Sequence, residues 1–356
     1  MRHFHLGLIV SLVAVVLPAA AELATGSPSP EINPYHVAVV AHDESHISWG
    51  AAEQLRSRGA AEGVGFELAL ASPAAGPDRS PDLVIMPVRS LATQVPELQV
   101  LELSFFYADL DAVHRVLDGP LGESLRQAAR ENGWEILAFW DEGMHVMSGL
   151  RRYDRAINLT GMEFIFTRPD PVAETQLGSW NAFPRRIQPE DNETVMRECM
   201  VASRATTLQE LWREQLQRVH LAITLTNHRY EGWVLAAPTS RWREIPANDR
   251  ERLQELVAGA THGQRRDARQ REMDTLSLLR KEGVIVHDVD EAERKAFQKA
   301  LPPWTELLSA DLDPVTRKRL VSLAATGSAA GTTAVTGAGT KPGSHTTHGT
   351  PASEAD

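Results

Sequence analysis

Short apolar runs alternate with amphipathic patterns between residues 100 and 166, and this alternation constrains the fold more than any other feature of the chain. Apolar positions at helical spacing predict a helix over 110–132, and a compact apolar run predicts a strand over 135–139. Trp140 and Gly143 form a Trp-x-x-Gly corner that leads into a second predicted strand. Strands that alternate with helices in this way are typical of an α/β protein.

The N-terminal part of the chain continues the alternation. The runs His36–Ala41, Phe66–Ala71 and Asp82–Met86 predict three strands, with a helical pattern over 45–61 between the first two. The third run is continuously apolar, as expected of a strand that is buried on both faces. This pattern predicts a mostly parallel sheet, and in such sheets ligands bind where strand ends meet helix starts.

A long helical pattern over 248–282 dominates the C-terminal third of the chain. It starts at a capping-box-like sequence, and Gly283 is suited to its C-terminal cap. Apolar residues occupy both ends, whereas the middle, 261–272, offers almost no apolar face. We expect this middle to be solvated and the two ends to pack against two lobes in turn.

The charge of the chain excludes one class of partner. Its 356 residues carry a formal net charge of −11 at pH 7, and no basic patch with interleaved aromatic residues occurs. We therefore expect no nucleic acid as a partner. From Thr326 onward the composition shifts to Gly, Ala, Ser and Thr, so residues 326–356 are expected to form a disordered tail.

The N-terminus has the features of a secretory signal. Arg2 precedes an apolar stretch of twelve residues, which Pro18 ends before a run of three alanines. The apolar stretch is too short to cross ~30 Å of hydrocarbon. We therefore expect residues 1–21 to be a cleaved signal peptide and the Ser/Pro-rich segment 22–34 to be a flexible leader.

The cysteine content indicates a compartment. Cys199 is the only cysteine, so no internal disulfide can form. Extracellular eukaryotic domains of this size usually carry several disulfides. A large exported chain without them fits a bacterial periplasm better, and we predict that location.

The sequence lacks the usual motifs of catalysis. We find no Gly-x-Ser-x-Gly elbow, no phosphate-binding Gly loop and no His-Glu-x-x-His, so neither an enzyme nor a cofactor is expected. His42 and His46, four residues apart after the first predicted strand, could ligate zinc. Because no third ligand with suitable spacing is evident, we interpret this segment as a polar, ligand-contacting loop and expect no metal.

Weak motifs follow one another in a familiar order along Tyr35 to Leu308. They lie in the segments Asp82–Leu98, Leu101–Gly122, Gly133–Gly143, Ile157–Gly161, Glu231–Arg252 and Gly283–Phe297. In this order they resemble the solute-binding proteins of tripartite ATP-independent periplasmic (TRAP) transporters, the DctP-like family. The resemblance covers almost the whole chain that follows the predicted signal.

The resemblance implies a two-lobed α/β periplasmic solute-binding protein fold with a hinge and a long lobe-spanning helix. We assign 35–140 and 232–282 to the first lobe, and 141–231 and 283–325 to the second lobe with the C-terminal helices. Closure of such lobes would bury a small solute.

The resemblance also implies an arginine that pairs with a solute carboxylate, and here the sequence departs from the family. The position of that arginine holds Ile165, and Glu163 replaces the lysine two residues before it. A second family arginine, two residues after the corner glycine, is matched by His145. A histidine would hold a carboxylate well only when protonated, so affinity could depend on pH. Pro238 replaces the family's asparagine before the second-lobe tryptophan.

Other residues near predicted strand ends are candidates for the wall of the cleft. They comprise cations that could replace the lost arginine, aromatic residues for an apolar wall and an acid in the polar loop after the first strand. With His145, the candidate substrate-binding residues are Arg89, Arg168, Arg204, Trp140, Trp180, Phe183 and Asp43.

Two hypotheses for the function follow. The leading one is an exported receptor that captures a small organic anion and delivers it to the membrane subunits of a TRAP-type secondary transporter. The alternative is a degenerate family member that acts as a sensor or protein-interaction module without transport, which the replacements at Ile165 and Pro238 favour.

Overall fold

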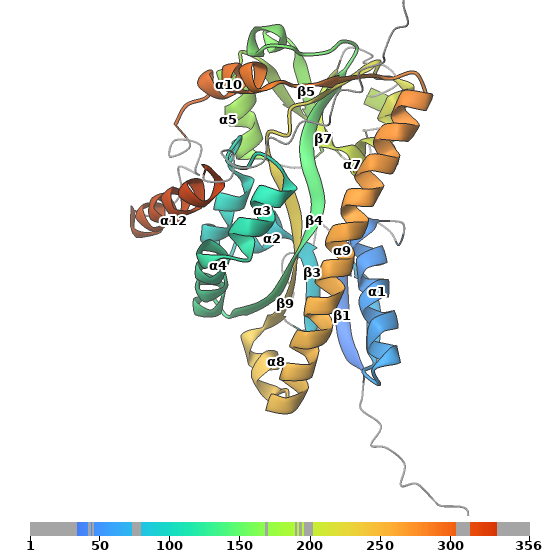
Figure 1. Cartoon of the computed structure of the whole chain (residues 1–356), viewed down its shortest axis with the longest axis vertical. Coiled ribbons are helices and arrows are strands. Elements are labelled where there is room, and N and C mark those ends of the chain that lie inside the picture. The colour runs from blue at the N-terminus through green and yellow to red at the C-terminus, as the bar shows by residue number, and fades with distance from the viewer. Residues whose placement is uncertain are drawn as a thin grey trace, which may run out of the picture. The chain divides into compact units, whose positions relative to one another are not determined.

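The computed structural model describes residues 34–332, with gaps at 42–43, 45, 73–79, 168–169, 189–190, 192–193, 196–201 and 304–313 (Figure 1). Its strands are β1 (Tyr35–Val40), β2 (Phe66–Ala71), β3 (Leu83–Pro87), β4 (Trp134–Gly149), β5 (Glu163–Phe166), β6 (Phe183–Arg186), β7 (Arg204–Thr207), β8 (Ala222–Leu225), β9 (Tyr230–Pro238) and β10 (Ile285–Asp288). Its helices are α1 (Ile47–Ala61), α2 (Val88–Ala92), α3 (Leu110–Leu117), α4 (Pro120–Glu131), α5 (Pro171–Ser179), α7 (Leu208–Arg213), α8 (Thr239–Glu244), α9 (Ala247–Lys281), α10 (Glu291–Lys299) and α12 (Pro314–Thr332). Short 3₁₀ helices are η1 (Pro96–Glu102), η2 (Ala156–Leu159) and η4 (Leu216–Arg218).

An eight-stranded mixed sheet organises these elements, in the order β10-β8-β4-β9-β3-β1-β2, with β7 also paired to β4. Strands β1, β2 and β3 are parallel, as predicted. The central β4–β9 pair is antiparallel, so the prediction of a mostly parallel sheet is wrong for the middle of the sheet. Strands β5 and β6 form a separate parallel pair.

Strand β4 takes part in both halves of this sheet. Residues Trp134–Met144 pair with β9, whereas His145–Ser148 pair with β7 and Met147–Gly149 with β8. We predicted two strands separated by a corner. The structure has one continuous strand with a register shift between Asp141 and Gly143, because a β-bulge bends a strand without ending it.

Helix α9 is the long helix that the sequence predicts, and it runs along β4 with α1 beside one end (Figure 1). Its other end contacts α7 and β10. The expectation of a solvated middle is wrong at Gln264, which is buried. Its side-chain amide donates to the carbonyl of Asp141 at 2.6 Å and accepts from the Asp141 amide at 2.9 Å. The polar middle of α9 therefore holds the bulge of β4.

The single helix predicted over 110–132 is two helices, α3 and α4. Asp109 caps α3, and its carboxylate accepts from the amide of Ala112 at 2.7 Å. Pro120 begins α4. Proline disfavours the helical conformation in the residue before it, so the first helix ends ahead of Gly119.

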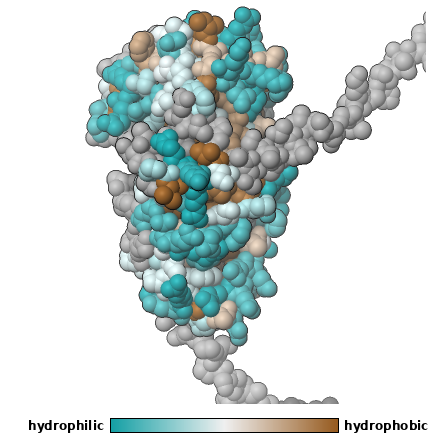
Figure 2. Space-filling view, turned by 90° about the vertical axis from the view of Figure 1, so that its left-hand side faces the viewer, coloured by the Kyte–Doolittle hydropathy of each residue, from teal (hydrophilic) through white to brown (hydrophobic). Residues whose placement is uncertain are grey.

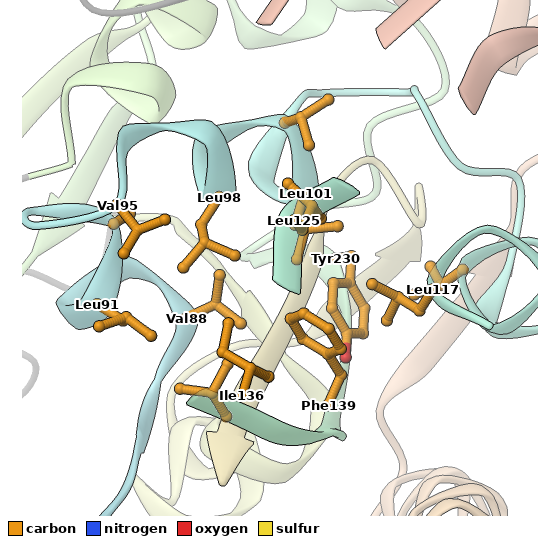
Figure 3. Packing of buried hydrophobic residues seen from close by; sticks show 14 of the residues in the cluster. Val88, Leu91, Val95, Leu98, Leu101, Leu117, Leu125, Ile136, Phe139 and Tyr230 are labelled. Atoms are coloured by element: carbon orange, nitrogen blue, oxygen red, sulfur yellow. The ribbon is translucent and has the colours of Figure 1, made fainter. Parts of the chain in front are cut away.

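The largest buried cluster fills the space between the sheet and the helices α2, η1, α3 and α4 (Figure 3). The side chains that Figure 3 labels are Val88, Leu91, Val95, Leu98, Leu101, Leu117, Leu125, Ile136, Phe139 and Tyr230. A second cluster packs the other face of the sheet against α1 and α9. The sheet is thus covered on both faces, which explains why β3 is apolar throughout.

Helix α12 contacts η1, α3 and α4, and Leu320 belongs to their cluster. The helix runs to Thr332, and the rest of the expected tail lies outside the described residues, as do the predicted signal peptide and residues 22–33 of the leader. The lobe boundaries given above stay a prediction. Within the described part of the chain, no helix has the length and apolarity needed to span a bilayer.

Hydrophilic residues cover most of the face in Figure 2, and the apolar areas on it are small and separate. The large apolar side chains that are exposed on the described residues come from many elements: Leu70, Leu150, Ile157, Phe183, Leu221, Met273, Leu278, Ile285 and Val315. Single exposed apolar residues of this kind are normal on a soluble surface.

Candidate functional site

A cavity of about 50 Å³ lies where β4 and β9 pass the segments around β5 and β7. This volume accommodates a few water molecules, so a larger solute requires the walls of the cavity to move apart. The described residues that line it are Arg89, Glu142, His145, Ile165, Phe166, Thr167, Asp170, Arg204, Ala205, Thr206, Glu210, Glu214, Arg229 and Glu231.

The bulge in β4 explains why Glu142 and His145 both reach this cavity. Side chains alternate between faces along a regular strand, so residues three apart would point to opposite faces. An extra residue in a bulge restores them to one face. Gly143, between them, has φ +151°, a backbone conformation that favours glycine.

The neighbouring antiparallel strand β9, with the residue before it, supplies more of the lining. Gly143 pairs with Glu231, and the amide of His145 donates to the carbonyl of Arg229 at 2.7 Å. This register places Arg229 and Glu231 beside His145, although 84 and 86 residues separate them in sequence.

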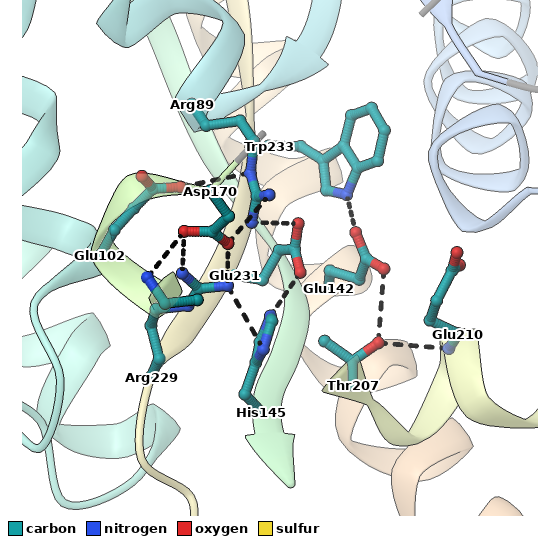
Figure 4. Close-up of polar contacts among 11 residues, drawn as sticks. Arg89, Glu102, Glu142, His145, Asp170, Thr207, Glu210, Arg229, Glu231 and Trp233 are labelled. Carbon is teal, nitrogen blue, oxygen red and sulfur yellow. Dashed lines mark hydrogen bonds and ion pairs between the residues drawn. The ribbon is translucent and has the colours of Figure 1, made fainter. Parts of the chain in front are cut away.

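Arg229, which is buried, and Arg89, whose side chain is 20% exposed, form the centre of a network of charges (Figure 4). Arg229 binds both oxygens of Asp170, at 2.6 and 2.8 Å. Arg89 lies 2.9 Å from Glu231, 3.4 Å from Glu102 and 3.4 Å from Asp170. The protein thus supplies its own carboxylates to guanidinium groups that line the cavity.

This pairing decides the ionisation of the network. Burial alone would raise the pKa of Asp170, but Arg229 and Arg89 hold that pKa well below its ordinary value. Burial alone would lower the pKa of Arg89, but the carboxylates of Glu231 and Glu102 raise that pKa above its ordinary value. Burial raises the pKa of Glu102 above its ordinary value. Asp170 and both arginines are therefore charged at neutral pH.

His145 links the two strands through its ring. One nitrogen, Nε2, lies 2.5 Å from Glu231, and the other, Nδ1, lies 3.5 Å from a guanidinium nitrogen of Arg229. Because the guanidinium can only donate, Nδ1 accepts and Nε2 donates to Glu231. Burial first, and Arg229 second, lower the pKa of His145, so the ring is neutral at pH 7.

A third arginine, Arg204, stands next to Ile165, where the resemblance implies an arginine. Arg204 donates to the carbonyl of Ile165 at 3.0 Å and forms an ion pair with Glu214. Both Arg204 and Ile165 line the cavity. The aliphatic side chain of Ile165 thus contributes wall surface, and the guanidinium beside it comes from β7.

The cavity brings together three of the candidate residues: Arg89, His145 and Arg204. Asp43 and Arg168 lie outside the described residues. The three aromatic candidates do not line it, for reasons that differ. Trp140 packs in the core, and its indole N–H donates to Thr261. Trp180 packs in another buried cluster, and its indole N–H donates to the carbonyl of Phe297. Phe183 lies on β6 and is 64% exposed.

Sequence reasoning missed Arg229 and the role of Glu231. Arg229 directly precedes the apolar strand β9 and is only 2% exposed. An arginine this deeply buried requires a charge partner. A charged pair that flanks Tyr230, at the start of an apolar run, is the signal that could have pointed to it.

Among the residues that the structure describes, two groups of side chains could offer ligands to a metal ion. His46, Glu142 and Glu210 form one group, and Asp154, His287 and Glu293 form another; within each, the ligand atoms lie within 4.8 Å of one another. In the first group, Nδ1 of His46 accepts from the amide of Ser48 at the start of α1. That leaves the proton of the neutral ring on Nε2. We assign no metal to either group.

Comparison with known proteins agrees with the resemblance read from the sequence. The model of the family described as bacterial extracellular solute-binding protein, family 7 (DctP), matches residues 79–310. A C4-dicarboxylate-binding periplasmic protein of Rhodobacter capsulatus is 22% identical over 210 residues, which are 59% of this chain and 63% of that protein. A C4-dicarboxylate-binding protein of Bacillus subtilis is 22% identical over 210 residues, 58% of this chain and 60% of that protein. The matched segment thus spans less than two thirds of these relatives.

Solved structures share the fold over a larger part of the chain. A TRAP periplasmic solute-binding protein from a Sulfitobacter species, with bound β-D-galacturonate, superposes with a TM-score of 0.69 at 16% identity, and covers 81% of this chain and 98% of that one. One from Shewanella oneidensis, with bound succinate, gives a TM-score of 0.68 at 16% identity, with coverages of 82% and 99%. These likenesses show the two-lobed solute-binding fold.

Proposed function

Because this chain belongs to family 7 of the bacterial extracellular solute-binding proteins, we propose that it captures a small organic acid in the cavity between β4, β7 and β9. Proteins that share its fold have been solved with succinate and galacturonate. We propose a periplasmic location for it, and delivery of the solute to the membrane subunits of a TRAP-type secondary transporter.

One observation carries this proposal: Arg229 lines the cavity and its Nε atom is buried without a hydrogen-bond partner among the described residues. A buried N–H without an acceptor costs about 1–3 kcal/mol. A solute carboxylate next to Arg229 would remove that cost. With Arg204 and Arg89, this guanidinium would take the place of the family arginine that Ile165 replaces.

A screen of organic acids tests the proposal. Thermal-shift measurements would identify candidates, and isothermal titration calorimetry would measure affinity and stoichiometry. We expect saturable binding of one solute per chain, weakened at least tenfold in Arg204→Met and unchanged in Arg152→Met, whose side chain is 57% exposed. Circular dichroism would establish that both variants fold.

Two results would count against the proposal. The first is no heat of binding with any acid although the protein is folded; it would favour the alternative of a sensor or interaction module. The second is equal affinity in Arg204→Met and the parent protein.

A further inference from the structure

We propose that the side chain of Phe105 is a latch, which holds two buried clusters of the molecule together and is released when the cavity opens. The inference goes beyond the proposed function, because it concerns how the walls of the cavity move apart and not which solute enters. Three observations carry it: the packing of the Phe105 ring, the backbone conformation of this residue and the contacts of Arg294.

The ring of Phe105 packs in a different cluster from its neighbours in the chain. Leu103 and Tyr107, two residues before and after it, belong to the cluster that η1, α3 and α4 cover. Phe105 belongs instead to a cluster whose members include residues of β5, α5 and α10. Among the described members of that cluster, Phe105 alone precedes Met147 in the chain. The loop between η1 and α3 thus inserts one ring into another part of the molecule.

Aromatic rings from three segments surround this side chain. The centroid of the Phe105 ring lies 6.2 Å from that of Trp180, 6.1 Å from that of His228 and 6.4 Å from that of Phe297. Trp180 directly follows α5, and Phe297 lies on α10. Aromatic pairs of this kind stabilise a contact beyond the burial of their area. The ring contacts therefore bind the loop of Phe105 to α5 and α10.

The backbone of Phe105 is strained in this position. Its φ is +55°, in the left-handed region that non-glycine residues rarely adopt. Such a conformation persists only where the surrounding structure holds it, and here the amide of Phe105 also donates to the carbonyl of His228 at 2.5 Å. Departure of the ring would release the strain. The ring contacts and the strain thus act in opposite directions, as a reversible latch requires.

Helix α5 connects the latch to the wall of the cavity. Asp170, which lines the cavity, caps the start of α5, and Trp180 caps its end. On the other side, Arg89 lies 3.4 Å from Asp170 and also pairs with Glu102, three residues before Phe105. Movement of α5 away from these residues would separate Asp170 from Arg89 at one end of the helix and Trp180 from Phe105 at the other. The latch and the cavity therefore open together.

Arg294, on α10, holds the latch from a further side. Its guanidinium carbon lies 5.0 Å from the centroid of the Phe105 ring, a cation–π contact. Its nitrogens donate to the carbonyls of Tyr107 at 2.6 Å, Thr226 at 3.0 Å and Asn227 at 3.2 Å. These hydrogen bonds fix the guanidinium over the ring and join α10 to the loop that carries Phe105.

The distance between two spin labels tests the latch without any solute. The labels would be attached to Gln127→Cys on α4 and Thr175→Cys on α5, two exposed positions. Cys199→Ser removes the only natural cysteine, and the doubly labelled chain with this change is the parent. Double electron–electron resonance measures the distribution of distances. We expect one main distance in the parent and, in Phe105→Ala, a longer distance that is populated at least fivefold more than in the parent.

The next residue in the chain provides a matched control. Phe106 is partly buried and packs against the first cluster, where its ring centroid lies 4.9 Å from that of Tyr107. We expect the distribution of the parent in Phe106→Ala. Arg294→Met removes the charge and the hydrogen bonds to the three carbonyls, and we expect the longer distance to rise at least threefold. Circular dichroism would establish that each variant folds.

Two further variants guard against loss of folding. Phe105→Leu replaces Phe105→Ala if the latter does not fold, because leucine keeps apolar bulk but has no ring for Arg294 to face. Should neither variant of Phe105 fold, Arg294→Met decides alone, with Arg294→Lys as the conservative change that keeps the charge.

Three results would overturn the inference. The first is a parent in which the longer distance already dominates, since the ring is then not docked in solution. The second is an unchanged distribution in the folded variant that decides the test, and the third is an equal shift in Phe106→Ala. None of them involves a solute, so the proposed function is judged separately, by the screen of organic acids.

Discussion

At the scale of single residues, the cost of burying a charge explains why the cavity is built from pairs. Arg229 and Asp170 are 2% and 7% exposed, and each would be strongly destabilising there without the other. The same pair sets the position of the guanidinium that we propose for solute binding. Stability and ligand recognition therefore depend on the same side chain.

Removing Arg229 should destabilise the protein strongly. In Arg229→Met the carboxylate of Asp170 keeps Arg89, at 3.4 Å, and the amide of Ala173, at 3.0 Å. We expect a loss of about 3–5 kcal/mol in the free energy of unfolding. Urea denaturation followed by circular dichroism measures it. The double variant with Asp170→Asn should recover part of the loss. A change below about 1 kcal/mol in the single variant would show that the pair is not buried in solution.

A buried histidine outside the cavity should make stability depend on pH. Burial lowers the pKa of His220 to about 4, and its ring nitrogens lie 2.9 Å from Ser148 Oγ and from the carbonyl of Ala202. The unfolded chain binds a proton near pH 6.5 and the folded one does not until about pH 4. The contribution of His220 to the free energy of unfolding is therefore fully present above pH 6.5 and decreases as the pH falls toward 4.

The variant His220→Gln should flatten this dependence. Each pKa unit corresponds to about 1.4 kcal/mol, so His220 accounts for roughly 3 kcal/mol of the decrease between pH 6.5 and 4. Urea denaturation at intervals of half a pH unit measures the slope in both proteins. Identical slopes would show that His220 is protonated alike in the folded and unfolded chain.

The sequence located some of the candidate site residues and missed others for a physical reason. His145 could be placed because the corner glycine fixes its register on a strand. Arg89 could be placed because it follows an apolar run, and Arg204 because it falls within a stretch that corresponds weakly to a motif of the family. Arg229 and Glu231 could not, since their proximity to His145 arises only from the pairing of β4 with β9. Long-range pairing of this kind leaves no local pattern.

At the scale of elements, the bulged strand β4 and the helix α9 depend on each other. A bulge leaves backbone groups without their usual partners in the ladder, and Gln264 supplies partners to Asp141 on both its amide and its carbonyl. The bulge in turn orients Glu142 and His145 into the cavity. Gln264, in the polar middle of α9, therefore binds backbone, which composition alone could not reveal.

Replacing the side chain of Gln264 should cost stability, whereas a similar change at an exposed position of α9 should not. In Gln264→Ala two buried backbone groups lose their partners, and we expect a loss of about 2–4 kcal/mol, from 1–3 kcal/mol for each group. In Gln270→Ala, whose exposed side chain bonds only Asp274, the loss should stay below about 0.5 kcal/mol. Equal effects in urea denaturation would contradict the role of Gln264.

The elements themselves were largely predictable. The strands β1, β2 and β3 and the helix α9 were found from apolar runs and helical periodicity, because their local pattern agrees with their final packing. The break between α3 and α4 was missed because the apolar spacing continues across Gly119. Pro120, the next residue, is the signal for a break, and its effect on the backbone before it outweighs the helical spacing of the apolar residues.

At the scale of the whole molecule, a solute that binds between the lobes of the folded chain should stabilise that chain against unfolding. A solute that binds the folded chain and not the unfolded one stabilises it by about 2.7 kcal/mol at a concentration of 100 Kd. We expect the melting temperature to rise with the concentration of the tightest solute found in the screen. Differential scanning calorimetry measures this, and a melting temperature independent of concentration would contradict specific binding to the folded state.

The most direct test of the central claim is a crystal structure of the protein with its tightest solute. Our account predicts electron density for one small molecule in the cavity, with a carboxylate at Arg229 or Arg204. Density at another place on the chain, with the pairs Arg229–Asp170 and Arg89–Glu231 closed over a cavity without solute, would contradict the account.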